Sequence, residues 1–396
     1  MTGPALYVTS PGAAAYDLGD GHPMRAVRSR LTFDLATELG VMDRPTWSLR
    51  EVGPAPDDVL TLVHTEGFVT MVQAADRLPA RMLAHIGLGT EDTPVIPDLH
   101  DAAASVVGAT VAACAAVRSG EALHAVNLSG GLHHAMRGHA SGFCVYNDAA
   151  VGIATLLRDG ISRVAYVDLD AHHGDGVEAC FVDDPRVLTI SLHQDGRTLF
   201  PGTGHAHEVG GPAALGHAVN VALPPGTGDA GWLRAFDAVV PELLRRFQPE
   251  IIVTQCGCDA HARDPLSDLK VSVEGFCRAY EALHELAQEL CAGRWVVLGG
   301  GGYDISSAVP RAWTQLLAVC SGGALDPETL SPEQWRVRAQ AVGGGTAPRR
   351  LGDGVTVVTR SWSDGPIDRD DPVDRAVCAT LEAVLPLHDA AQFGFR

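Results

Sequence analysis

Short runs of β-branched and other apolar residues alternate along the chain with longer segments in which apolar residues recur every three to four positions. The short runs predict strands at Leu6 to Thr9, Ala125 to Leu128, Arg163 to Asp168, Val187 to Leu192, Glu250 to Gln255 and Trp295 to Gly299. The longer segments predict helices at Arg25 to Leu39, Asp98 to Arg118, Asp148 to Arg158, Asp229 to Arg246, Val273 to Cys291 and Ile305 to Cys320. This alternation predicts an α/β fold with a mainly parallel central sheet flanked by helices in three layers.

The 396 residues would allow two or three ordinary domains, and a single large α/β domain is equally compatible with the length. From about Gly322 onward the sequence becomes rich in Pro, Gly and charged residues and carries no catalytic motif or repeat. We therefore expect a catalytic domain over residues 1–322. Residues 323–396 are expected to form a C-terminal extension packed on, or peripheral to, that domain.

The net charge of the chain limits the classes of molecule that are expected to bind it directly. With 48 acidic and 29 basic residues the formal net charge is −19, which repels phosphate backbones and anionic membranes, so neither nucleic acid nor a membrane is an expected direct partner. The apolar stretch Ala102 to Val117 is shorter than the roughly 18 residues that span a bilayer, and it contains Ser105, Gly108 and Thr110. It predicts a buried core helix.

Nine cysteines are scattered along the chain, an odd number in no disulfide-framework pattern. Cys256 and Cys258 are separated by one residue, which is closer than the cysteines of a zinc knuckle, so packing in the core is the expected role. The first ten residues show no basic cluster followed by an apolar core, and hence no signal peptide. A reducing compartment, the cytoplasm, is expected.

The densest group of metal-ligand side chains follows the strand predicted to end at Asp168. Residues 168–175 read Asp-Leu-Asp-Ala-His-His-Gly-Asp. In an extended strand alternate side chains share a face, so Asp168, Asp170 and His172 can point toward one centre. A metal site explains this pattern. The alternative is a solvated acidic loop with helix-capping aspartates, but two consecutive histidines have no place in a cap.

Other unusual residues follow other predicted strands, where the ligand sites of parallel sheets lie. Gly130 to His134 presents adjacent histidines beside glycines, although such a pair could also be satisfied within the core. Asp259 adds a carboxylate, although a lone aspartate after a strand is usually a turn former. Gly299 to Tyr303 places four glycines before a phenol. That run lacks the Lys-Ser or Lys-Thr of a phosphate loop and is expected to deliver the Tyr303 hydroxyl into a site.

Taken in order, these segments resemble the catalytic motifs of the zinc-dependent histone deacetylase family. The resemblance is carried by Gly130 to Asp148, Tyr166 to Gly176, Phe200 to Gly204, Asp259 and Gly299 to Tyr303. The stretch Leu88 to Pro94 and the C-terminal extension are similar in particular to the bacterial acetoin-utilisation branch. The resemblance implies an arginase/deacetylase-like fold and hydrolysis of the acetyl amide of Nε-acetyl-lysine in proteins. Acetylated metabolic enzymes such as acetyl-CoA synthetase are the implied substrates.

The resemblance also implies a metal. Asp170, His172 and Asp259 would hold one Zn²⁺ per chain, with the fourth position left for water and the substrate carbonyl. Fe²⁺ is an alternative because an oxygen-rich ligand set accepts both ions.

The catalytic residues implied are His133, His134, Asp168, Asp175 and Tyr303. His134, paired with Asp175, would take the proton of water and later give it to the leaving amine. His133, paired with Asp168, would act as an electrostatic partner, because histidines in different carboxylate environments differ in proton affinity. Tyr303 would donate a hydrogen bond to the developing oxyanion.

Further residues are implied around the reacting atoms. The walls of a narrow apolar tunnel for the lysine stem would be Gly142, Phe143, Phe200 and Leu266, and Asp92 would hold the substrate backbone at the rim. Ordinary core packing is the alternative for both phenylalanines. Arg25 matches an arginine near an acetate exit behind the metal. A structural K⁺ would be bound by Asp168, Asp170, His172, Ser191 and Leu192.

Three other functions share parts of this pattern. A ureohydrolase resembling arginase needs additional carboxylates for a second metal, and the segment around Asp259 supplies only one. An acetylpolyamine amidohydrolase shares the catalytic set but takes a free polyamine. A noncatalytic acyl-lysine binding module would not need the histidine pair and Tyr303. The sequence gives no indication of the oligomeric state.

Overall fold

An eight-stranded sheet forms the centre of the residues that the computed structural model describes, 3–19 and 21–392. Its strands are β1 (Ala5–Thr9), β2 (Trp47–Glu51), β3 (His124–Asn127), β4 (Val164–Asp168), β5 (Val187–Gln194), β6 (Ala218–Leu223), β7 (Ile251–Gln255) and β8 (Trp295–Leu298). They are arranged in the order β2-β1-β3-β8-β7-β4-β5-β6, and each neighbouring pair is parallel. The predicted fold class is confirmed, in a single domain with a sheet that is parallel throughout.

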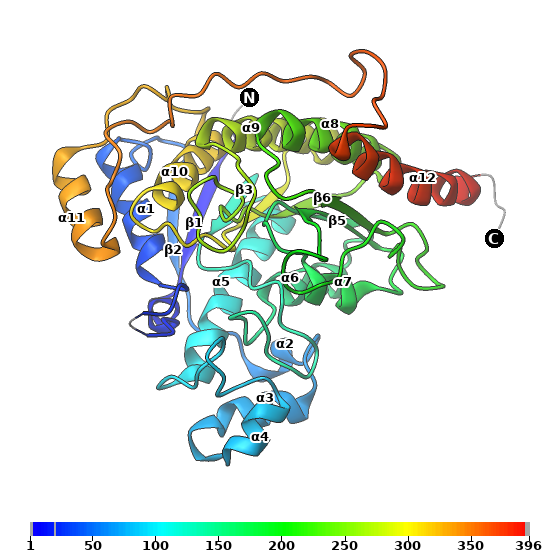
Figure 1. Cartoon of the computed structure of the whole chain (residues 1–396). Helices are drawn as coiled ribbons and strands as arrows, with labels where there is room; N and C mark the ends of the chain where they lie inside the picture. The colour runs from blue at the N-terminus through cyan, green and yellow to red at the C-terminus, as the bar shows by residue number, and fades with distance from the viewer. Residues whose placement is uncertain (1–2, 20, 393–396) are drawn as a thin grey trace.

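Helices cover both faces of this sheet. The longer ones are α1 (Val27–Glu38), α5 (Leu99–Ser119), α6 (Asp148–Arg158), α8 (Asp229–Phe247), α9 (Val273–Cys291), α10 (Ala308–Ser321), α11 (Glu333–Gly343) and α12 (Pro372–Gln392). Shorter elements are η1 (Pro11–Ala15), α2 (Asp57–Leu60), α3 (Glu66–Gln73), η2 (Ala75–Arg77), α4 (Ala80–His85) and α7 (Asp175–Phe181). In Figure 1, α8 and α9 lie on one side of the sheet and α5 to α7 on the other, while α2 to α4 form an appendage below.

Alternate residues of the buried strands face opposite layers, as the geometry of an extended chain requires. In β4, Val164 and Tyr166 pack with apolar side chains of α5 and α6, whereas Ala165 and Val167 pack with those of α8 and α9. Strands covered on both faces in this way must be apolar at nearly every position, because neither face reaches water. This is why continuous apolar runs predicted the inner strands well.

The loops that carry the unusual residues follow the four strands β3, β8, β7 and β4, which are consecutive in the middle of the sheet. Because all strands run in parallel, their carboxyl ends lie at the same edge. Residues distant in sequence are thereby brought together at one place. The two edge strands β2 and β6 were not predicted. Three of the five β2 residues are exposed, and Asn220 interrupts the apolar pattern of β6.

Helix α5 is longer than the apolar stretch within it, and by length and hydropathy its 21 residues would suffice to cross a membrane. In the fold, 67% of its most apolar window is buried against the rest of the protein. It packs on α6, β1 and β3, as expected of a core helix. All nine cysteines lie in described parts of the chain and carry free thiols.

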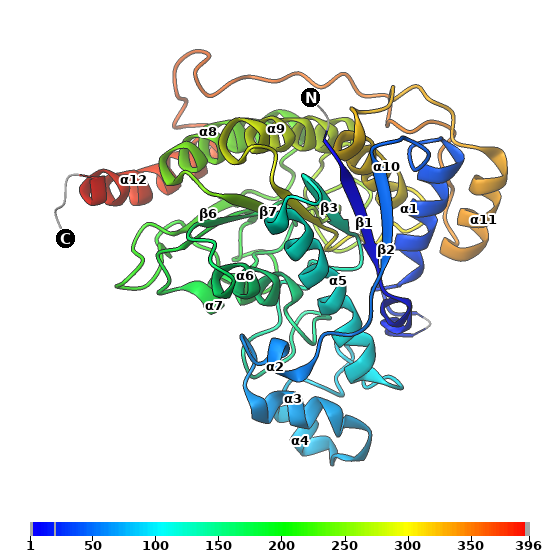
Figure 2. The same cartoon turned by 180° about the vertical axis from the view of Figure 1, so that it is seen from behind.

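The C-terminal segment crosses the molecule. Beyond α11 the chain runs along the side of the sheet covered by α8 and α9, and α12 then packs on α8 and β6 (Figure 2). The Trp335 side chain of α11 is completely buried, and its indole Nε1–H donates a hydrogen bond of 2.8 Å to the Leu31 carbonyl. Residues 393–396 of the expected extension lie outside the described residues.

Candidate active site and metal centre

Three potential metal ligands meet at the carboxyl edge of the sheet. Asp170 and His172 follow β4, and Asp259 follows the adjacent strand β7. One ligand atom from each residue lies within 4.8 Å of the other two, and all three side chains are buried. His172 Nδ1 is 3.0 Å from Asp170 Oδ1 and 2.9 Å from Asp259 Oδ2. The structure therefore brings together the three residues that were expected to bind the metal.

Neighbouring groups hold the two carboxylates in this orientation. Asp170 Oδ2 accepts hydrogen bonds from the Gln255 amide (2.5 Å) and the Gly301 backbone N–H (2.7 Å). Asp259 Oδ1 accepts one from the Ala171 N–H (2.8 Å). These bonds turn Asp170 Oδ1 and Asp259 Oδ2 toward the His172 ring. The close approach of the backbone requires glycine at 301, where a Cβ would lie 2.2 Å from Asp259 Oδ2.

The electrostatics of this group favour a bound cation. Burial and the charge of Asp170 raise the pKa of the Asp259 carboxyl to about 6. Burial also acts against ionisation of Asp170, but His133 and His172 hold the pKa of that carboxyl well below its usual range. Two buried carboxylates beside one imidazole are stable together only with nearby positive charge. Two oxygens and one nitrogen form the ligand set of a divalent transition metal with an open position, so the residues fit such an ion.

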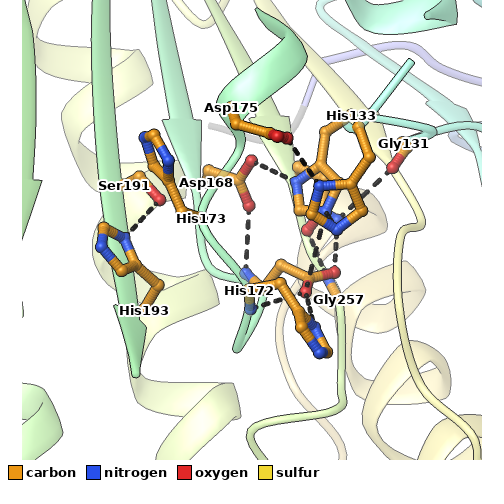
Figure 3. Close-up of polar contacts among 12 residues, drawn as sticks. Gly131, His133, Asp168, His172, His173, Asp175, Ser191, His193 and Gly257 are labelled. Atoms are coloured by element: carbon orange, nitrogen blue, oxygen red, sulfur yellow. Dashed lines mark hydrogen bonds and ion pairs between the residues drawn. The ribbon is translucent and has the colours of Figure 1, made fainter. Parts of the chain in front are cut away.

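Next to this group, each of the two adjacent histidines contacts its own carboxylate. His133 Nδ1–H donates to Asp168 Oδ2 over 2.8 Å, and His134 Nδ1–H donates to Asp175 Oδ1 over 2.7 Å. The two Nε2 atoms are 3.0 Å apart. Asp168 is the last residue of β4 and Asp175 the first residue of α7. Both expected pairs are thus present in the structure (Figure 3).

The two histidines differ strongly in proton affinity. Burial lowers the pKa of His133, but the charges of Asp168 and Asp170 outweigh this effect and raise that pKa to about 9. Burial and the neighbouring His133 lower the pKa of His134 to about 4, despite Asp175. At neutral pH, His133 is therefore charged and His134 neutral. The 3.0 Å contact then consists of His133 Nε2–H donating to the lone pair on His134 Nε2.

Tyr303 reaches the same place from β8. Its backbone N–H donates to Asp264 Oδ2 over 2.8 Å, and its ring meets the Phe143 ring edge-on with centroids 5.8 Å apart. Burial, together with the charges of Asp259 and Asp170, raises the pKa of the Tyr303 hydroxyl well above its ordinary value. The phenol therefore keeps its proton and is available as a hydrogen-bond donor.

Two phenylalanines flank the histidines and the tyrosine. The Phe200 ring meets His134 edge-on at 4.9 Å and is 46% exposed, which places it between the buried centre and solvent. Gly142 lies between them, since a Cβ at this position would lie 2.5 Å from the His134 ring and 2.9 Å from that of Phe200. Phe143 adopts a left-handed backbone conformation, with φ of 69°, that is unusual for a residue with a side chain.

The other expected substrate contacts lie around this opening. Asp92 is exposed, and its carbonyl is 3.3 Å from His22 Nε2. The His22 ring packs edge-on against Phe143 at 4.6 Å, so His22 connects Asp92 with Phe143. Leu266 is half-buried, and its N–H donates to Asp264 Oδ1 over 3.0 Å. Leu266 and Tyr303 are thus held by the same carboxylate.

The residues expected to bind a monovalent cation are also neighbours. Ser191 of β5 is paired in register with Asp168 of β4, and Leu192 follows it on the strand. The Ser191 hydroxyl lies 2.8 Å from His193 Nδ1 (Figure 3). The pairing places Ser191 beside Asp168, on the β5 side of β4.

Sequence reasoning missed an arginine behind the glycine run. Arg28 is buried, and its Nη1–H donates to the Gly302 carbonyl over 2.9 Å. Arg25, which was expected near an acetate exit, forms an ion pair of 3.3 Å with Asp17 and lines the same small cavity as Arg28. Arg25 precedes α1, which begins at Val27, whereas Arg28 lies in the first turn of this helix. Which of them reaches Gly302 depends on where the helix begins, and the sequence pattern does not give that point to within one residue.

Supporting residues of other kinds were missed as well. The carboxylate of Asp148, the first residue of α6, accepts the backbone N–H groups of Gly131 and Leu132 at 2.8 to 3.0 Å and so holds the loop before the histidines. Gln255 orients Asp170, and Asp264 orients Tyr303. In sequence, Asp148 resembles a helix cap and Asp264 a turn residue, so only their position after the strand clusters could have indicated a role.

Comparison with known proteins agrees with this geometry. The histone deacetylase domain matches residues 22–320, which include every residue of the site described above. An acetoin utilization protein AcuC of Bacillus subtilis (strain 168) is 40% identical over 373 residues, 94% of this chain and 92% of the relative. The AcuC proteins of Staphylococcus aureus (strain MSSA476) and Staphylococcus xylosus are 36% and 33% identical, over 78% and 88% of this chain and 80% and 90% of theirs.

The matching domain covers most of the chain, and the similarity to AcuC proteins extends over nearly its full length. The family consists of metal-dependent deacetylases, in agreement with the buried Asp-His-Asp group. The chain therefore belongs to the histone deacetylase family, in its AcuC-like branch.

Proposed function

We propose that the chain hydrolyses the acetyl amide of Nε-acetyl-lysine in proteins and releases acetate, with one Zn²⁺ held by Asp170, His172 and Asp259. The observation that carries the proposal is the pair of adjacent histidines, each hydrogen-bonded to its own carboxylate, directly beside this ligand group. The bound metal would lower the pKa of a water molecule and polarise the amide carbonyl. Fe²⁺ would suit the same donors.

Side chains of the protein would perform the proton transfers and stabilise the charge that develops. His134 Nε2 is the unprotonated ring atom, because Nδ1–H is engaged with Asp175. The attacking water replaces His133 Nε2–H at this lone pair and gives its proton to it. The charged His133 stabilises negative charge that develops beside it. Tyr303 donates its hydroxyl proton in a hydrogen bond to the carbonyl oxygen as that oxygen becomes an anion. His134 then passes its proton to the lysine amine as it leaves.

The substrate enters between the aromatic side chains. Gly142, Phe143, Phe200 and Leu266 would line the passage for the four methylenes of the lysine stem, whose burial is favourable. Asp92 at the rim would accept hydrogen bonds from the peptide backbone. Asp168, Asp170, His172, Ser191 and Leu192 would hold a K⁺ behind the metal. The name shared by the relatives, acetoin utilization protein, makes acetylated metabolic enzymes of the cytoplasm, such as acetyl-CoA synthetase, the substrates to test first.

The test compares two acetyl amides under the same conditions. Chelator-stripped protein, reloaded with Zn²⁺ or Fe²⁺, is assayed for acetate release from an acetyl-lysine peptide and from N-acetylputrescine. We expect no activity without metal and a higher kcat/KM for the peptide. Preferential hydrolysis of N-acetylputrescine would instead identify a polyamine amidohydrolase. Tight peptide binding without acetate release would identify a binding module.

A further inference from the structure

The C-terminal segment places a carboxylate under the loop that carries Asp259. Asp353 Oδ2 accepts hydrogen bonds from His261 Nε2–H (2.9 Å) and the Val273 backbone N–H (2.8 Å). Its Oδ1 accepts one from Arg311 Nη2 (2.8 Å). The Arg311 side chain is fully buried in α10, so Asp353 both balances this charge and links it to the loop.

His261 transmits this contact into the loop between Asp259 and Leu266. Its Nδ1 accepts the Arg263 N–H over 3.1 Å, so Nε2 carries the proton that binds Asp353. The His261 carbonyl accepts the Asp264 N–H over 2.8 Å. Asp264 in turn accepts the backbone N–H groups of Tyr303 (2.8 Å) and Leu266 (3.0 Å). A continuous series of hydrogen bonds thus connects Asp353 to the backbone of Tyr303.

A second part of the same segment, residues 343–345, packs closely against Ser306, just beyond Tyr303. A Cβ at Gly343 would lie 2.6 Å from Ser306 Cβ, and one at Gly345 would lie 2.6 Å from Ser306 Oγ. Glycine at both positions therefore allows the C-terminal backbone to approach the Ser306 segment. The C-terminal segment contacts the loops on both sides of the site, one after β7 and one after β8.

We propose that the C-terminal segment is a working part of the active site, in which Asp353 acts through His261 as a positioning residue for Asp259, Leu266 and Tyr303. The inference rests on the proposed deacetylase function for one of its readouts. Its second readout, metal affinity, is independent of the substrate. A displacement of about 1 Å in a site of this kind is enough to lower turnover by up to about 100-fold.

The chain offers a matched control in a second buried Arg–Asp pair. Arg234 of α8 binds Asp374 of α12 through Nε–Oδ1 (2.5 Å) and Nη2–Oδ2 (2.9 Å), and both side chains are at most 5% exposed. Ser361, Trp362, Asp368 and Asp371 also contact this pair, and all four belong to the C-terminal segment. Asp374→Asn therefore weakens the attachment of the segment to the core without touching the loop after β7.

Asp353→Asn and Asp374→Asn are compared with the parent at a temperature well below their melting points. Both should lower the melting temperature. Asp353→Asn should also lower kcat on an acetyl-lysine peptide by about tenfold or more, with KM changed less, and weaken Zn²⁺ binding in competition with a chelator by a similar factor. Asp374→Asn should leave kcat and Zn²⁺ affinity within about twofold of the parent.

His261→Leu provides a second route, because it removes the link but leaves the Asp353–Arg311 pair in place. It should reproduce the loss of kcat and Zn²⁺ affinity even if Asp353→Asn does not fold. The inference is overturned if the folded Asp353 or His261 variant keeps parental Zn²⁺ affinity and kcat, or if Asp374→Asn loses as much as they do. Should the parent itself not act on acetyl-lysine, the proposed function fails. The Zn²⁺ affinities of the three variants then decide this inference alone.

Discussion

The two halves of the active site, one around His133 and the other around His134, have neighbouring backbones but different surroundings. His133 lies on the interior side, between Asp168 and Asp170, and these carboxylates keep it charged. His134 lies against Phe200, with the charged His133 next to it, and its Nδ1–H donates to Asp175. Identical side chains thus acquire different charge states. Two carboxylates outweigh the effect of burial on His133, whereas burial and the charge of His133 keep His134 neutral.

This difference in charge suits the two roles that the proposed function gives to the histidines. A neutral imidazole that faces the substrate passage can receive a proton, whereas a charged one can only stabilise negative charge. The two carboxylate partners of the histidines come from different elements, because Asp168 ends β4 and Asp175 begins α7 after the intervening loop.

The largest effect is expected from the loss of the ligand group that both halves face. Asp259→Ala removes a charged oxygen donor and leaves Asp170 and His172, so the protein should lose its metal and its turnover should fall to background. Elemental analysis of the purified variant, alongside an acetate-release assay, measures both. Stoichiometric Zn²⁺ in the variant would show that Asp259 is not a ligand.

The next largest effect should come from replacing the histidines, and it should differ between the two. His134→Ala removes the proton acceptor and should lower kcat by about 10²–10⁴-fold, whereas His133→Ala, which removes a charge, should cost less. Both variants should retain metal, which elemental analysis can verify before the kinetics are compared. An equal or larger loss in His133→Ala would reverse the assignment.

A slightly smaller loss is expected when the oxyanion donor opposite both histidines is deleted. Tyr303→Phe keeps the ring contact with Phe143 but removes the hydroxyl, and should lower turnover about 10²–10³-fold, or roughly 2.7–4 kcal/mol. Melting temperature and metal content should match the parent. Turnover within about threefold of the parent would mean that Tyr303 is only a packed aromatic residue.

The smallest effects are expected in the pH dependence of kcat/KM, which distinguishes the roles of the two histidines most clearly. Asp175 raises the pKa of His134, so Asp175→Asn should lower that pKa further and move the acidic limb of kcat/KM to lower pH. Asp168 raises the pKa of His133, so Asp168→Asn should lower the pKa from about 9 and move the alkaline limb to lower pH. Profiles of kcat/KM against pH for both variants check this. Movement of the same limb in both variants would contradict the separate roles.

Much of the site was predictable because its ligands follow predicted strands. The cluster after Asp168, the histidines after Gly131 and the tyrosine after Gly302 were recognisable since parallel strands deliver their carboxyl ends to one edge. The apolar runs that located these strands are long because both faces are buried. The strand β2 escaped prediction because it lies at the edge of the sheet and is largely exposed.

What could not be predicted depends on contacts between distant segments. Nothing local marks Arg28 as a partner of Gly302, or Asp353 as a partner of His261, because each pair forms only when the whole domain has folded. Gln255 and Asp264 have ordinary local patterns and acquire their roles from the atoms they meet. Supporting residues of an active site are therefore less visible in sequence than its ligands.

The proposed hydrolysis requires one metal ion per chain, bound beside a neutral and a charged histidine. The most direct measurement is a titration of chelator-stripped protein with Zn²⁺, in which acetate release from an acetyl-lysine peptide is followed at each addition. Activity should rise linearly and reach its plateau at about one equivalent per chain, as expected of a site with three protein ligands. Full activity in the stripped protein, or a plateau only at about two equivalents, would contradict this requirement.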